Sequence, residues 1–92
     1  MIRDGAIFGH SESAIWDDVD GVLTLCNTQT VEFFRLNEAG AMIWKACGET
    51  SSLYRIVETL AAVYSDEPAE KLEQEATVFL LALMDEGLLT SS

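Results

Sequence analysis

The sequence has few of the residues on which common catalytic and metal sites depend. Its 92 residues include one histidine, two cysteines and one proline. Cys26 and Cys47 lack the spacing of a zinc site, and we expect both to be buried free thiols. The sequence contains no glycine-rich phosphate loop, nucleophile motif or calcium-loop pattern. We therefore expect a protein that is not an enzyme and that uses no metal or cofactor.

Basic residues are also scarce, which limits the partners. Five basic against sixteen acidic residues give a net charge of −11, which would repel a phosphate backbone and an anionic membrane surface. The first residues contain no apolar run as long as a signal peptide or a membrane span. We expect a cytoplasmic protein with no nucleic-acid or membrane partner.

What the sequence does have is a segment rich in β-branched and aromatic residues, followed by helical periodicity. The first part predicts three short strands, over residues 14–19, 22–26 and 30–36. Asp20-Gly21 suits a two-residue hairpin turn between the first two strands.

Helical patterns fill the rest of the chain, over residues 37–48, 53–64 and 68–86, and Asn37 is placed as the N-cap of the first helix. We expect an α+β, winged-helix-like domain over residues 14–92, with a three-stranded antiparallel sheet followed by three helices. Residues 1–13 are polar and contain glycine, which predicts a flexible, loosely held N-terminal arm that includes His10.

The third predicted strand has apolar residues on both faces. A period of two places Phe34 and Leu36 on one face and Val31, Phe33 and Arg35 on the other. We therefore expect Val31 and Phe33 either to be covered by the fold, for example by the N-terminal arm, or to contact a partner.

The third predicted helix has a core stripe that includes Leu72, Phe79 and Leu83, and it leaves Val78 and Leu81 outside this stripe. These two residues could be isolated exposed apolar residues, a homodimer contact or one wall of a groove. In a meander the third strand is an edge, which could take an extended peptide as a further strand. A groove between that strand and the third helix would then be lined by Val31 and Phe33 and by Val78 and Leu81. Charged residues nearby would select peptides by charge, namely Arg35, Glu32, Glu75 and Asp85.

Several segments, in order, resemble the PqqD-like family. Phe33-Phe34-Arg35-Leu36-Asn37-Glu38-Ala39-Gly40-Ala41-Met42-Ile43-Trp44 is similar to its strand-to-helix signature. Residues 53–60 with Tyr64 are similar to its second helix, and 78–80 with Leu83 and residues 87–89 to its closing helix and tail. Together with the Asp20-Gly21 hairpin, the resemblance covers roughly residues 14 to 89.

Members of this family recognise precursors of ribosomally made, post-translationally modified peptides. The resemblance implies a winged-helix-like fold that pairs a leader strand with its third strand, beside the third helix. Carried over to this sequence, it implies peptide-binding residues at Val31, Phe33, Arg35, Val78, Leu81 and Asp85. If the other side of the helix faces the strand, Thr77, Leu80 and Met84 replace the last three.

The resemblance also implies a partner enzyme, such as a radical-SAM protein, a cyclodehydratase or a leader peptidase with its cyclase. Two other interpretations remain open. A winged-helix transcription regulator has a similar order of elements, but the third predicted helix has Lys71 as its single basic residue. A homodimeric interaction module would use the same strand edge for itself.

Overall fold

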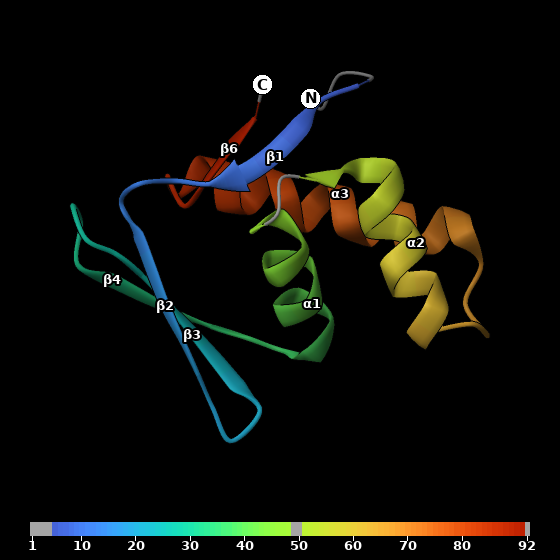
Figure 1. The fold of residues 1–92 in the computed structure, drawn as a ribbon, viewed down its shortest axis with the longest axis horizontal. Helices are drawn as coiled ribbons and strands as arrows, with labels where there is room; N and C mark the ends of the chain where they lie inside the picture. The colour runs from blue at the N-terminus through green and yellow to red at the C-terminus, as the bar shows by residue number, and fades with distance from the viewer. Residues whose placement is uncertain (1–4, 49–50, 92) are drawn as a thin grey trace.

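The computed structural model describes residues 5–48 and 51–91, and in these residues it contains three helices and two three-stranded antiparallel sheets (Figure 1). The elements, in chain order, are β1 (Ile7–His10), β2 (Ala14–Val19), β3 (Val22–Asn27), β4 (Glu32–Leu36), α1 (Glu38–Cys47), β5 (Ser51–Ser52), α2 (Leu53–Val63), α3 (Ala69–Asp85) and β6 (Leu89–Ser91). The predicted α+β class, with a three-stranded sheet followed by three helices, is confirmed. The winged-helix description stays a prediction.

The first sheet has the strand order β2-β3-β4 and contains the predicted hairpin. Asp20 and Gly21 both have positive φ, at 53° and 79°, as a two-residue turn that matches the strand twist requires. The third strand starts later than predicted, because Val31 has φ 60° and lies in the turn before β4. The prediction that Val31 is a strand residue is therefore wrong.

The second sheet, with the order β5-β1-β6, was not predicted. It contains residues 7–10 of the supposed loose arm, and β1 pairs with β6 from Phe8↔Ser91 to His10↔Leu89. Phe8 is fully buried in the core. A loose arm is therefore the wrong description of residues 7–10, because the burial of Phe8 and the pairing on both sides of β1 hold this segment. Residues 1–4 lie outside the described residues.

The prediction that His10 is loosely held in that arm is also wrong. Its ring stacks on the indole of Trp44, with centroids 3.7 Å apart, and its Nε2 lies 2.7 Å from the Trp44 carbonyl oxygen. The rings of Trp16 and His10 meet edge-to-face, with centroids 6.2 Å apart. His10 thus joins β1 to both α1 and β2.

Helix α1 lies between the β2-β3-β4 sheet and α2, and α3 crosses the molecule from the side of α2 toward the side of β4 (Figure 1). Asn37 caps it by accepting a hydrogen bond from the Gly40 amide, as predicted, and Ser52 caps α2 in the same way through the Arg55 amide. The core is formed by residues from both sheets and all three helices: Ala6, Phe8, Leu23, Leu25, Ile43, Trp44, Cys47, Ile56, Leu60, Leu72, Ala76, Leu80, Leu83, Leu88 and Leu89. Cys26 and Cys47 are buried free thiols, as expected. In the described residues, no helix is long and apolar enough to cross a membrane.

Candidate functional site

Strand β4 has one open edge in the described part of the chain. It pairs with β3 from Leu23↔Leu36 to Asn27↔Glu32, and β2 lies on the far side of β3. The backbone groups on the other side of β4 therefore have no strand partner among these residues. Such an edge can accept an extended segment as an additional strand.

The side chains of β4 alternate between two environments. Phe34 and Leu36 point to the side of the sheet on which α1 lies, and both pack against the core. Phe33 and Arg35 point to the outer side and are exposed, Phe33 by 68%. Phe33 therefore does not point toward the helices, as a residue on the floor of a groove between β4 and α3 would.

Helix α3 comes near both ends of β4. At one end Phe79 contacts α1 directly after β4, because a Cβ on Gly40 would lie only 3.0 Å from Cζ of Phe79. At the other end Nδ2 of Asn27, in the strand next to β4, donates to the Glu86 carbonyl oxygen at 2.7 Å. Phe79 therefore lies near the end of β4 and Glu86 near its start, in the opposite chain direction.

The predicted α3 residues lie on one side of the helix. At about 100° per residue, Val78, Asp85 and Leu81 fall within about 60° of one another, with Phe79 next to Val78 and nearly opposite Leu81. Val78 is 68% exposed, Asp85 is exposed and Leu81 is half-buried. The alternative set faces the protein interior, because Leu80 is fully buried.

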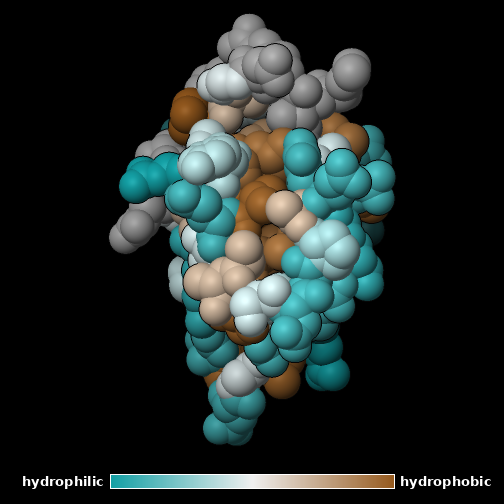
Figure 2. Space-filling model, turned by 90° about the vertical axis from the view of Figure 1, so that its right-hand side faces the viewer, coloured by the Kyte–Doolittle hydropathy of each residue, from teal (hydrophilic) through white to brown (hydrophobic). Residues whose placement is uncertain are grey.

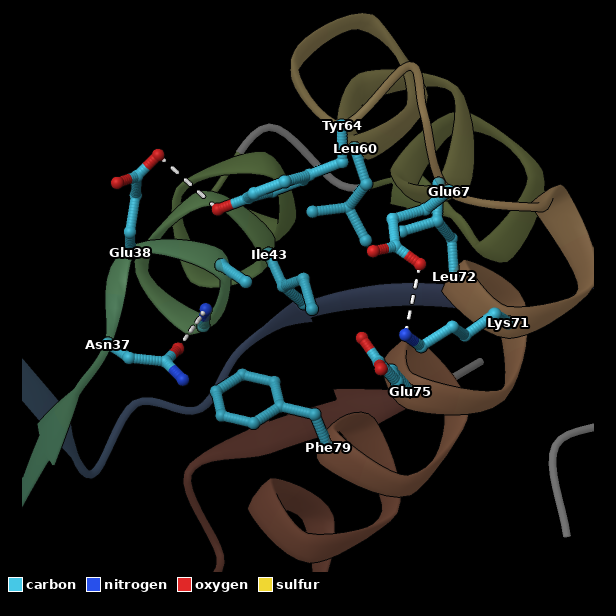
Figure 3. Close-up of a pocket in the computed structure, with 12 residues that line it drawn as sticks. Asn37, Glu38, Ile43, Leu60, Tyr64, Glu67, Lys71, Leu72, Glu75 and Phe79 are labelled. Atoms are coloured by element: carbon cyan, nitrogen blue, oxygen red, sulfur yellow. Dashed lines mark hydrogen bonds and ion pairs between the residues drawn. The ribbon is translucent and has the colours of Figure 1, made fainter.

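A hollow of about 560 Å³ opens where β4 continues into α1. We call it the helical hollow, and it is lined by Asn37, Glu38, Ala39, Gly40, Ile43, Leu60, Tyr64, Glu67, Lys71, Leu72, Glu75 and Phe79 (Figure 3). Of these residues, only Glu75 was predicted to contact a partner. The face of the molecule that carries α2 and the start of α3 has an apolar strip between polar borders (Figure 2).

Polar contacts hold the sides of the helical hollow. Tyr64 donates its hydroxyl to Oε1 of Glu38 at 3.3 Å, and burial together with the Glu38 carboxylate raises the pKa of Tyr64. Lys71 pairs with Glu67 at 3.0 Å. The hydrogen bond to Glu67, and the charges of Glu67 and Glu75, raise the pKa of Lys71. Tyr64 therefore stays neutral and Lys71 stays positively charged at neutral pH.

A second, smaller hollow of about 320 Å³ lies on the outer side of the sheet. This sheet hollow is lined by Ile15, Trp16, Asp17, Val19, Thr24, Leu25, Cys26 and Phe33. The register places Ile15, Cys26 and Phe33 side by side across the three strands. Ile15 and Val19 are 58% and 56% exposed.

The residues of the two hollows do not form a metal site. In the described ranges 5–48 and 51–91, no three His, Cys, Asp or Glu side chains are grouped so that they could hold a metal ion. The helical hollow combines an apolar floor with charged borders, and the sheet hollow is mostly apolar with Asp17 as its one charged lining residue. Both arrangements suit binding of a peptide or protein.

Comparison with known proteins agrees with this arrangement. Residues 22–89 match the family model described as coenzyme PQQ synthesis protein D (PqqD). The chain belongs to the PqqD family. The match includes β3, β4, all three helices and the start of β6, and therefore the open strand edge and the whole of α3.

Two solved structures share this PqqD-family fold. "TbiB1 in Complex with the TbiA(beta) Leader Peptide" is 28% identical, with a TM-score of 0.82 over 88% of this chain and 93% of that chain. "Lasso peptide synthetase B1 complexed with the leader peptide" has a TM-score of 0.81 over 90% of this chain and 96% of that chain. Its identity of 17% supports similarity of fold alone. No curated protein sequence matches the chain.

Proposed function

We propose that this protein binds the leader segment of a ribosomally synthesised precursor peptide and has no catalytic role of its own. The observation that carries the proposal is the open edge of β4, with α3 near both ends of the strand and the helical hollow where β4 continues into α1. TbiB1, which shares the fold at 28% identity, is a protein in complex with a leader peptide.

In this proposal the leader adds to β4 as a fourth strand of the β2-β3-β4 sheet. Main-chain hydrogen bonds supply affinity, and alternate side chains of the leader point toward α3 and toward the outer side. Val78 and Asp85 contact the leader from α3. Phe33 and Arg35 flank its outward side chains, and Phe34 and Leu36 lie beneath the inward ones. Leu81 lies on the same side of α3, and Val31 lies in the turn just before β4, at the end of this path.

A titration with backbone-modified peptides tests strand addition directly. The probe is a fluorescein-labelled peptide of the leader encoded beside this gene, with a single N-methyl group placed at each position in turn. We expect alternate N-methyl groups to weaken binding about tenfold or more, because only every second amide faces β4. An even effect at neighbouring positions, or no binding of the unmodified leader, would overturn the proposed mode.

Two valine variants separate the leader site from the rest of the surface. Val78→Glu should weaken leader binding about tenfold or more, because it places a charge against an apolar contact. Val19→Glu makes the same change at an exposed valine on β2 and should leave leader binding unchanged. Thermal unfolding of both variants checks that the fold survives.

Size-exclusion chromatography with and without the peptide tests whether a second copy of the chain takes the edge instead.

The second part of the proposal is delivery of the bound leader to a separate modifying or processing enzyme. The sheet hollow supports it, because monomeric proteins seldom leave a contiguous apolar face exposed. The leader would then contact the open edge of β4, and the enzyme would contact the outer side of the same strand. We expect Val19→Glu to lose binding to the maturation enzyme encoded beside this gene in calorimetry, while Val78→Glu keeps it. The opposite result would place the enzyme elsewhere.

A further inference from the structure

The helical hollow has an apolar floor between two aromatic rings. Ile43, Leu60 and Leu72 form the floor, and the rings of Tyr64 and Phe79 lie on opposite sides of it (Figure 3). Gly40 makes room for the Phe79 ring, since any larger residue would displace it. The space of about 560 Å³ is large enough for a long side chain.

The border of this hollow is predominantly acidic. Three carboxylates, Glu38, Glu67 and Glu75, surround it together with one cation, Lys71, which leaves two negative charges in excess. Lys71 is engaged by Glu67. In residues 5–48 and 51–91, neither Glu38 nor Glu75 has an ion-pair partner within 4 Å. An apolar floor, aromatic rings and unneutralised carboxylates together favour a side chain with an apolar stem and a cationic end.

The hollow also lies on the path of the proposed leader strand. Asn37 and Glu38, on its border, directly follow the last residue of β4. A peptide paired along β4 therefore reaches the hollow as soon as it extends past Leu36.

We propose that the helical hollow takes a lysine or arginine side chain of the leader, with its methylene groups on the apolar floor and its charge among Glu38, Glu67 and Glu75. This inference rests on the proposed function and adds a charge requirement to it. A second copy of the chain is a poor occupant, since each copy carries a net charge of −11. A neutral aromatic or aliphatic side chain is the competing occupant that the experiment must exclude.

The test is a double-mutant cycle between the protein and the labelled leader peptide. Each Lys or Arg of the leader is replaced in turn by norleucine, which keeps an apolar stem and removes the charge. Each peptide is titrated against the parent protein, Glu75→Gln and Glu73→Gln. Glu73 is exposed on α3 outside the hollow, so its variant makes the same charge change as a matched control.

We expect one basic position whose replacement weakens binding about three- to fivefold, the upper range for an ion pair near the surface. At that position the loss should be clearly smaller in Glu75→Gln, where Glu38 and Glu67 remain, and persist in full in Glu73→Gln. If no basic position couples to Glu75, or if Glu73→Gln reduces the loss equally, the charge requirement is wrong while leader binding stands. If the parent leader does not bind at all, the proposed function itself fails.

Lys71→Met gives an independent readout in the opposite direction. Removing the only cation on the border should tighten binding of the parent leader about two- to threefold, because it increases the negative charge that the leader meets. The gain should vanish with the peptide that carries norleucine at the coupled position. Weaker binding, or the same gain with both peptides, would overturn the proposal.

Discussion

The two faces of the β2-β3-β4 sheet use the same kinds of residue for opposite purposes. The inner face has Leu23 and Leu25, which are fully buried beneath α1, and the outer face has Ile15 and Phe33, which are mostly exposed. Strand β4 contributes to both. The comparison teaches that apolar content alone does not identify the core face, because the position of the helices decides which apolar residues are covered.

Alanine substitutions on the two faces should differ most strongly in stability. Leu25→Ala should lower the free energy of unfolding by about 2–5 kcal/mol, since it leaves a cavity in the core. Phe33→Ala should change it by no more than about 0.5 kcal/mol, because the side chain is already largely in water. Urea unfolding followed by tryptophan fluorescence measures both values.

Equal losses from these two substitutions would contradict the comparison, because they would mean that the outer face is also covered in solution. If the change in the free energy of unfolding caused by Phe33→Ala then depended on protein concentration, a second copy of the chain would be what covers the outer face. Leu23→Ala is the matched inner-face control, and it should behave like Leu25→Ala.

Local sequence signals predicted much of the fold. The Asp20-Gly21 turn, the Asn37 cap and the helical periodicity each depend on residues close together in the chain, and each lies where it was predicted. The core stripe of α3 was also predicted, since Leu72 and Leu83 are buried.

Features that depend on distant segments were missed. The β5-β1-β6 sheet joins residues from both ends of the chain, so its strand pairing leaves no local pattern in the sequence. Strand β5 has only two residues, which is too short for a recognisable pattern. The helical hollow was missed for the same reason, because Ile43, Tyr64 and Phe79 come from different parts of the chain. Phe33 was placed on the correct strand, and only the position of the helices relative to the sheet could say which way it points.

The core that the inner face covers contains the Cys47 thiol, which should make stability depend on alkaline pH. Burial raises the pKa of Cys47 from 9.0 to about 12. An unfolded chain therefore loses this proton at lower pH than the folded protein does, and the free energy of unfolding falls as the pH rises from 9 toward 12. At pH 10.5 we expect the loss from this thiol to be about 1–2 kcal/mol.

Cys47→Ala isolates this effect from the titration of tyrosines and lysines. Urea unfolding at pH 8 and pH 10.5 should show a smaller decrease in the variant than in the parent protein. The same decrease in both proteins would mean that the thiol is not desolvated in solution.

A substitution in the turn before β4 should make the protein more stable. This turn sets which residues of β4 face outward. Val31 has φ 60° and a 67% exposed side chain, so it adopts a left-handed conformation that β-branched residues disfavour and contributes little packing. Val31→Asn should raise the free energy of unfolding by about 0.5–1 kcal/mol, since Asn tolerates this conformation. Val19→Asn, at an exposed valine in β2, should lower it instead. If both variants lose stability equally in urea unfolding, Val31 is not strained, and the turn that sets the direction of Phe33 must differ from the one described.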